Sequence, residues 1–290
     1  MSGTETLVIL AGGLSSRMKK SMETEGLSED DVKQANTASK GMIGIGKGGR
    51  PLMDYLLYNT QKAGIHNVII VTGEDNAAIK NQYGRKDRDN DFHGLNISYA
   101  VQYIPEGRQK PYGTADALLH AFEAYPELKS SIVYVCNSDN LYSQDAFEKL
   151  RQCKAPNALI NYDRDALDFP PQRISAFAVT QVDNENYLVN IVEKPPVDEV
   201  DQYRDSQGKI RVSMNIFKFD GKMIYPYILN CPVNPVRDEK ELPTAILNMT
   251  KDNPKSFYCV PHSEHVPDLT EKKDIKIFRE YLEKNYPDMW

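Results

Sequence analysis

The fold is decided by LVILAGGLSSRMKK, residues 7–20, in which an apolar run ends at two glycines and a basic polar segment follows. Leu7–Ala11 is typical of a buried strand. Glycine directly after such a strand lets backbone N–H groups approach an anion, and a following helical turn adds its positive end. Arg17 could then hold a phosphate through two hydrogen bonds. The same pattern also fits a plain turn with an exposed arginine, so the stretch alone leaves both interpretations open.

The spacing of the glycines excludes two familiar nucleotide motifs. The chain has neither G-x-G-x-x-G nor G-x-x-x-x-G-K-[ST] at this position. These motifs mark dinucleotide-binding proteins and P-loop NTPases, respectively. The sequence therefore does not favour a hydride-transferring enzyme or an ordinary P-loop ATPase.

Strand-like and helix-like segments alternate after the opening stretch. The predicted strands are Asn67–Thr72, Leu95–Val101 and Ser131–Cys136, and the predicted helices are Pro51–Ala63 and Thr114–Tyr125. Strands separated by helices indicate a mostly parallel sheet that is covered on both faces. We therefore expect a Rossmann-like α/β fold with a mixed sheet, whose ligands bind at the carboxyl ends of the strands.

The second half of the chain has a different pattern of predicted elements. After about Ala155, strand-like runs predominate, and two helical patterns follow near the end of the chain. The predicted strands are Ala158–Tyr162, Ile174–Val182, Tyr187–Val192 and Lys209–Phe219, and the helices are Leu242–Thr250 and Glu271–Tyr286. We interpret this half as strands added to the same sheet together with a lid or substrate region. Residues 18–39 are polar and charged, and we expect a loop there with one short helix.

Composition limits the function. The 290 residues are 40% hydrophobic and 26% charged, with a formal net charge of −6. That charge argues against nucleic acid and anionic membranes as partners, since both attract a basic face. The apolar runs are too short for a signal peptide or a membrane span. The four cysteines are scattered without CxxC pairs, which favours reduced thiols in a cytoplasmic protein.

One aspartate is placed to hold a metal. Asp139 follows the predicted strand Ser131–Cys136. A carboxylate at the carboxyl edge of a central parallel strand is suited to Mg²⁺, which takes oxygen ligands and bridges phosphates. An Asx turn or a helix cap before Ser143 is the structural alternative.

Two further stretches are candidates for binding. Gly113 permits a close backbone approach just before a helix, although Thr114 could simply cap that helix. Glu193 and Lys194 end a strand at Pro195 and are therefore presented into a loop. Lys194 could neutralise a phosphate and Glu193 could accept sugar hydroxyls, whereas a solvated strand end is the alternative.

A last candidate precedes the C-terminal helix. Asp268 is a candidate second metal ligand in the sequence HVPDLT, residues 265–270. We expect Thr270 to cap a helix that begins near Glu271. Capping explains the threonine but leaves the aspartate unexplained.

Taken together and in this order, these motifs resemble those of the sugar-1-phosphate nucleotidylyltransferases, which make NDP-sugars. The resemblance spans nearly the whole chain. The matching residues are Leu10-Ala11-Gly12-Gly13 with Arg17-Met18, Lys40, Gly49-Arg50-Pro51-Leu52, Gly113-Thr114-Ala115, Asp139, Glu193-Lys194-Pro195 and Asp268-Leu269-Thr270.

The resemblance implies a Mg²⁺-dependent enzyme that joins a nucleoside triphosphate to a sugar-1-phosphate and releases pyrophosphate. It implies a single domain, residues 1–290, in which residues 1–155 bind the nucleotide and residues 156–290 bind the sugar phosphate. The implied nucleotide-binding residues are Leu10, Ala11, Gly12, Gly13, Arg17, Lys40, Gln109, Gly113 and Thr114. Asp139 and Asp268 would bind the metal, and Glu193, Lys194 and Asn215 the sugar phosphate. Arg17, Asp139 and Lys194 would carry catalysis.

Several features depart from the family pattern. Ser138 stands where many members have glycine, and the connection from Arg17 to Lys40 is longer than usual. Either Gln102 or Gln109 could be the glutamine that contacts the base. The segment Val212–Phe217 stands where many members have N-x-G-[IV]-[YF].

The sequence leaves the substrates and the oligomeric state open. UTP or dTTP with a hexose-1-phosphate is the preferred pair. A guanylyltransferase of molybdenum cofactor synthesis, or another cytidylyltransferase, is the alternative enzyme. A non-catalytic sensor of nucleotide or sugar phosphate on the same fold is an alternative of another class.

Overall fold

The centre of the fold is a parallel sheet built by the first half of the chain. The computed structural model describes residues 5–175, 177–193 and 195–290. Its central strand is β1 (Glu5–Leu10), which pairs in parallel with β2 (Asn67–Thr72) on one side and β5 (Ile132–Asn137) on the other. Beyond β2 lies the parallel strand β4 (Leu95–Val101). These strands confirm the Rossmann-like core predicted from the sequence.

The second half of the chain extends the same sheet. The order across it is β10-β6-β9-β5-β1-β2-β4-β3. The added strands are β3 (Asn90–Phe92), β6 (Asn157–Asp163), β9 (Arg211–Asp220) and β10 (Phe257–His262). β9 runs antiparallel to both β5 and β6, which makes the sheet mixed. A hairpin of β7 (Val179–Val182) and β8 (Leu188–Val192) pairs with β9 outside this order.

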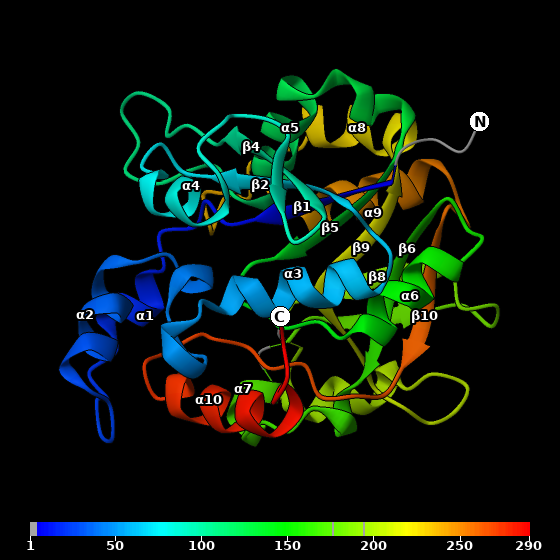
Figure 1. Ribbon diagram of the computed structural model, residues 1–290. Coiled ribbons are helices and arrows are strands. Elements are labelled where there is room, and N and C mark those ends of the chain that lie inside the picture. Colours follow the sequence, from blue (N-terminus) through cyan, green and yellow to red (C-terminus); the bar gives the residue numbers. More distant parts are fainter. Residues whose placement is uncertain (1–4, 176, 194) are drawn as a thin grey trace.

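Helices cover both faces of the sheet because the side chains of β1 alternate between two apolar cores. Leu7 and Ile9 face one core and Val8 the other. The first core contains side chains of α3 (Leu52–Lys62), α6 (Gln144–Gln152) and α10 (Asp274–Asn285). The second contains those of α5 (Thr114–Ala124), α8 (Gly221–Leu229) and α9 (Leu242–Asp252). In Figure 1 α3 lies below β1, and α5 and α8 lie together above it.

Shorter helices connect these elements. The remaining α-helices of the described residues are α1 (Ser16–Lys20), α2 (Glu29–Thr37), α4 (Ala77–Tyr83) and α7 (Pro171–Ile174). Short 3-10 turns occupy Lys40–Met42, Lys47–Gly49, Pro126–Ser130, Arg164–Ala166 and Val197–Tyr203. None of the helices among the described residues is long and apolar enough to cross a bilayer.

The polar segment 18–39 folds more fully than a loop. The predicted short helix is α2, and α1 overlaps the start of the segment. Ser28 caps α2, because its Oγ accepts a hydrogen bond from the Asp31 backbone while the Asp31 carboxylate accepts one from the Ser28 backbone. Arg279 of α10 then binds Asp31 at 2.8 Å. The segment is thus tied to the C-terminal helix.

Two predictions about local structure are wrong. The predicted strand Ile174–Val182 is a strand only at β7, because Pro170 and Pro171 begin the helical turn α7. Thr270 does not cap α10, which begins at Asp274. The Asp274 carboxylate instead accepts hydrogen bonds from the Thr270 and Glu271 backbones at 2.8 and 2.7 Å, and so folds a turn ahead of the helix.

Candidate functional site

The strand order places a site at the carboxyl ends of β1 and β5. The chain builds β2 and β4 on one side of β1 and then returns to add β5 on the other. Ligands of open α/β sheets bind at such a switch point. The glycine loop is held there, because the Ala11 N–H donates to the Val71 carbonyl at 2.8 Å and the Leu10 carbonyl accepts from the Ser138 N–H at 3.3 Å.

A cavity of about 290 Å³ opens at this edge. Most of the nucleotide-binding residues predicted from the sequence line it. The lining residues are Leu10, Ala11, Gly12, Gly13, Ser15, Ser16, Arg17, Ser39, Lys40, Gln102, Thr114, Ala117, Asn137, Ser138 and Asp139. Residues from the N-terminal loop, the β4 end, α5 and the β5 end are thus brought together.

The two glycines of the loop meet different surroundings. A Cβ on Gly12 would stand 3.1 Å from Gln102 Oε1, so Gly12 is packed against that side chain. A Cβ on Gly13 would meet nothing within 4 Å. Ser15 then adopts a left-handed backbone with φ of 56°, and Arg17 is exposed on α1 at the cavity.

Lys40 and Asp139 form an ion pair in the lining of the cavity. Lys40 Nζ lies 2.9 Å from Asp139 Oδ2, and Lys40 is only 8% exposed. The long connection from Arg17 therefore still delivers the lysine to the cavity. Since a buried ammonium needs a partner, the pair fixes both side chains.

Asp268 lies beside Asp139 but does not line the cavity. Asn140 and Asp268 form a β-bridge, and the Leu269 N–H donates to the Asp139 carbonyl at 2.8 Å. Arg173 of α7 binds the Asp268 carboxylate at 2.7 Å. Burial raises the pKa of Asp268, and the charge of Asp139 raises it further, whereas Arg173 opposes both effects. The two carboxylates are therefore close enough to repel one another.

This arrangement is suited to Mg²⁺. The described residues contain no group of three or more His, Cys, Asp or Glu side chains that could hold a metal. Mg²⁺, however, is usually bound through one or two carboxylates together with water and substrate phosphates. Asp139 and Asp268 offer oxygen donors of that kind, and a cation would relieve their repulsion.

Helix α5 begins behind the cavity. Gly113 precedes it with φ of 102°, a conformation that favours glycine. Thr114 does not cap the helix, because its hydroxyl accepts a hydrogen bond from the Leu242 N–H of α9 at 2.9 Å. Of the two candidate glutamines, Gln102 is buried and lines the cavity, whereas Gln109 is exposed in the loop 103–113.

The residues predicted to bind the sugar phosphate, as far as the structure describes them, do not line this cavity. Glu193 is 42% exposed and lies 3.3 Å from Arg237. Lys194 lies outside the described residues. Asn215 has φ of 59°, which glycine favours and asparagine tolerates, and its carbonyl accepts from the Tyr142 hydroxyl at 3.2 Å.

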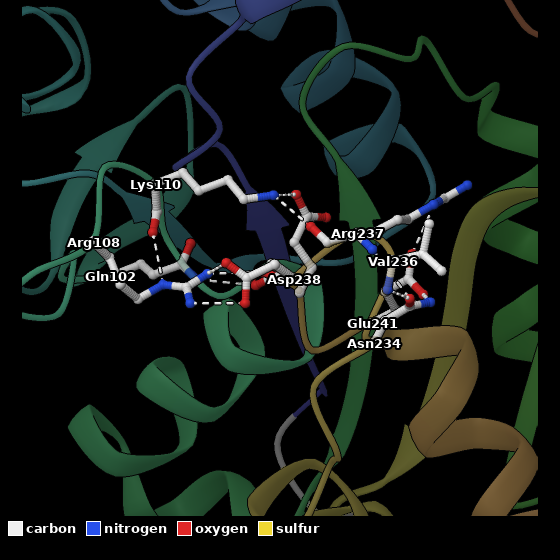
Figure 2. Close-up of polar contacts among 10 residues, drawn as sticks. Gln102, Arg108, Lys110, Asn234, Val236, Arg237, Asp238 and Glu241 are labelled. Carbon is white, nitrogen blue, oxygen red and sulfur yellow. Dashed lines mark hydrogen bonds and ion pairs between the residues drawn. The ribbon is translucent and has the colours of Figure 1, made fainter.

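The loop 103–113 is fastened to the turn 234–241. Arg108 Nη1 donates to Asp238 Oδ1 at 3.0 Å, and Lys110 Nζ donates to the Arg237 carbonyl at 2.6 Å and to Glu239 Oε1 at 2.9 Å. Figure 2 shows Arg108 and Lys110 reaching toward this turn, with Arg237 continuing away from the loop. We call this set of contacts the loop clamp. It connects the cavity side of the sheet to the turn that carries the partner of Glu193.

Three polar residues near the site escaped prediction from the sequence: Asp116, Arg173 and Arg237. Each of them binds the side chain of a residue that is not its neighbour in the sequence: Asp116 binds Gln102, Arg173 binds Asp268 and Arg237 binds Glu193. Arg173, for example, binds Asp268, 95 positions away. An isolated charge carries no periodicity, so only the fold reveals its partner.

The fold and the cavity together define a Rossmann-like α/β protein with cations and carboxylates gathered at one sheet edge. The model of a known family agrees with that class. The nucleotidyl transferase family model matches residues 7–265, and the chain belongs to this family.

Proposed function

We propose that the protein transfers a nucleotidyl group from a nucleoside triphosphate to a sugar-1-phosphate, forming an NDP-sugar and pyrophosphate. One observation carries the proposal. The glycine loop, Arg17, Lys40 and Asp139 line a single cavity at the switch point of the sheet. Asp268 lies beside that cavity through its bridge to Asn140.

The reaction needs positioning and charge neutralisation more than proton transfer. A phosphate oxygen of the sugar-1-phosphate attacks the α-phosphorus of the triphosphate. A new bond forms between that oxygen and the α-phosphorus, and the bond from the α-phosphorus to the β-bridging oxygen breaks, so pyrophosphate leaves with the electron pair. The nucleophile is already an anion at neutral pH, and no general base is required.

The cations of the site supply the neutralisation. Arg17 is exposed at the cavity, where it can bind the leaving pyrophosphate. Lys40 is proposed to lie near the phosphates of the triphosphate, and Lys194 is proposed to bind the incoming phosphate. Glu193 is proposed for the sugar hydroxyls. Arg237 forms an ion pair with Glu193 at 3.3 Å, so sugar binding would compete with that ion pair.

Asp139 and Asp268 are proposed to hold Mg²⁺. Bound Mg²⁺ neutralises phosphate charge and orients the phosphates. Arg173 and Thr270 both bind Asp268 Oδ2, which fixes the direction of that carboxylate. Lys40 holds Asp139 through Oδ2 alone.

We propose UTP or dTTP and a hexose-1-phosphate as the substrates and the cytoplasm as the location. The free state of Cys136, Cys153, Cys231 and Cys259 supports a reducing compartment.

A pyrophosphate-release screen tests the proposal. Nucleoside triphosphates are combined with sugar-1-phosphates, and with phosphocholine as another acceptor, in the presence of Mg²⁺. We expect release only when a sugar-1-phosphate is present. Ligand binding without release from any pair would instead identify a sensor.

Asp139→Asn provides the matched variant. We expect it to fold and to lose at least about a hundredfold in turnover, because the amide carries no charge for the metal. Near wild-type turnover by this variant with Mg²⁺ would refute the role of Asp139.

A further inference from the structure

The cavity lining reaches from the end of β5 to the end of β4, and the sheet order places β1 and β2 between these two strands. The lining residues that carry a charge are Arg17, Lys40 and Asp139, and we call the β5 side the charged end. Gln102, Thr114 and Ala117 supply the other end from the end of β4 and from α5, and none of these side chains carries a charge. Because phosphates require cations, the uncharged end is left for the base.

Gln102 can present only one polar group to that end. Its Nε2 donates to the Gly113 carbonyl at 2.9 Å and to Asp116 Oδ2 at 2.9 Å, which uses both amide hydrogens. Both partners are acceptors, so the opposite amide orientation would set Oε1 against two oxygens. Oε1 therefore points the other way, and it lies 3.1 Å from where a Cβ on Gly12 would stand.

Asp116 is the group that enforces this orientation. It is 7% exposed on α5 and does not line the cavity. The same Oδ2 atom also lies 3.7 Å from His120 Nε2. Gln102 itself is 4% exposed, so water does not compete freely for its amide. A buried carboxylate thus acts on the cavity through a neighbouring side chain.

We propose that Asp116 is a positioning residue that locks Gln102 as a hydrogen-bond acceptor and thereby selects the base of the nucleotide. Uracil, thymine and guanine carry a ring N–H on their pairing edge. Cytosine and adenine have a lone pair at the equivalent ring nitrogen. The locked Oε1 pairs with the former bases and repels the latter. This inference rests on the proposed nucleotide site and narrows its substrate class.

Equilibrium binding in the absence of sugar phosphate tests the inference. UTP, dTTP, GTP, CTP and ATP are titrated into the wild type by equilibrium dialysis. We expect the three nucleotides with a ring N–H to bind at least about tenfold more tightly than CTP and ATP. With CTP or ATP, Gln102 Oε1 would face the lone pair of the ring nitrogen, and a buried acceptor without a donor costs about this much in affinity.

Two substitutions separate positioning from folding. Asp116→Ala should reduce the preference at least about threefold, because the amide of Gln102 then loses one of its two restraints. Asp116→Asn should keep the preference, because its amide oxygen still accepts from Gln102. Glu123→Ala, on the exposed face of the same helix, is the matched control and should change nothing.

The outcomes distinguish this inference from the proposed function. Equal binding of CTP and UTP by the wild type, or full preference in a folded Asp116→Ala, would overturn the inference and leave the nucleotide site intact. Failure of the folded wild type to bind any of the five nucleotides would overturn the proposed function and this inference together.

Discussion

Gly12 and Gly13 are adjacent, but the fold constrains them differently. Gly12 is packed against Gln102, whereas a side chain on Gly13 would enter open space. The fold therefore gives no reason for glycine at position 13. A ligand gives one, since a Cβ there would stand between the backbone and a bound phosphate.

Gly13→Ala tests that explanation. We expect its free energy of unfolding to stay within about 0.5 kcal/mol of the wild type, because nothing in the fold contacts the new methyl group. We expect the dissociation constant of the nucleoside triphosphate to rise about tenfold, as for the loss of one hydrogen bond to a charged group.

Gly73→Ala is the control for that substitution. Gly73 follows β2 at the same edge and does not line the cavity, and a Cβ added to it would also meet nothing within 4 Å. We expect unchanged nucleotide binding. The affinity of both variants for the nucleoside triphosphate is measured by equilibrium dialysis. Equal affinities would show that Gly13 does not bind phosphate.

Individual residues were predictable from the sequence where a local motif carries them. Gly12, Gly13, Thr114 and Asp139 line the cavity, and each follows a readable strand or begins a readable helix. Lys40 also lines the cavity, but only the family resemblance implies it, because no strand end or helix start marks it in the sequence. The sequence spacing could not decide whether Gln102 or Gln109 lines the cavity. Gln102 directly follows β4 and lines the cavity, whereas Gln109 is exposed in the loop that follows.

At the level of elements, the loop clamp joins the 103–113 loop to the 234–241 turn. Arg108 also stacks over the Tyr112 ring, with its guanidinium carbon 3.8 Å from the ring centre. Since this loop runs between Gln102 and Gly113, we expect its conformation to affect the uncharged end of the cavity, which is proposed for the base.

Arg108→Ala and Asp238→Ala test the clamp. We expect each variant to raise the KM for the nucleoside triphosphate with little change in kcat, because the clamp holds the loop in place and touches no proposed reacting group. The double variant should resemble the single ones, since both remove one interaction. Additive effects in steady-state kinetics would show that the two side chains act separately. Lys129→Ala, which removes an exposed ion pair with Glu123, is the control.

A second connection between elements joins α2 to α10 through Asp31 and Arg279. Burial pushes the pKa of Asp31 upward, but hydrogen bonds from Arg279 and Ser28 outweigh burial and hold the pKa below its ordinary value of 3.8. A carboxyl whose pKa is lowered by folding stabilises the fold above its ordinary pKa, and this stabilisation is lost as the pH falls through the folded value.

Arg279→Leu should therefore lower the Tm at pH 7 by about 2–4 °C, the shift that about 1 kcal/mol produces in a protein of this size. The difference from the wild type should shrink in acid, where Asp31 is protonated in both proteins. Differential scanning calorimetry across this pH range makes the comparison. A difference that is constant with pH would assign the loss to packing alone. Lys273→Ala, which removes exposed contacts to Glu23 and Glu271, should behave as wild type.

Helices and strands were predictable where the hydrophobic periodicity of a segment agrees with the residues that mark its ends. The strands of the central sheet and α3, α5 and α9 were recognised in this way. Proline obscured two others: α8 contains Pro226 within the helix, and β10 contains Pro261 but lies at the sheet edge, where proline is tolerated.

At the scale of the whole molecule, residues from both halves of the chain meet at one edge of one sheet. The first half supplies the glycine loop, Lys40 and Asp139. The second half supplies Asp268 with its partner Arg173. Glu193 and its partner Arg237 do not line the cavity. The alternating pattern predicted the edge, but antiparallel β9 between β5 and β6 could not be predicted, because strand order depends on pairing between distant segments.

The most direct test of nucleotidyl transfer is ³¹P NMR of a reaction mixture that contains the protein, Mg²⁺, a sugar-1-phosphate and the nucleoside triphosphate that binds most tightly. We expect the resonances of an NDP-sugar and of pyrophosphate to grow in equal amounts, and neither to grow when the sugar-1-phosphate is omitted. Hydrolysis of the triphosphate without a sugar product, or bound substrates that stay unchanged, would contradict nucleotidyl transfer.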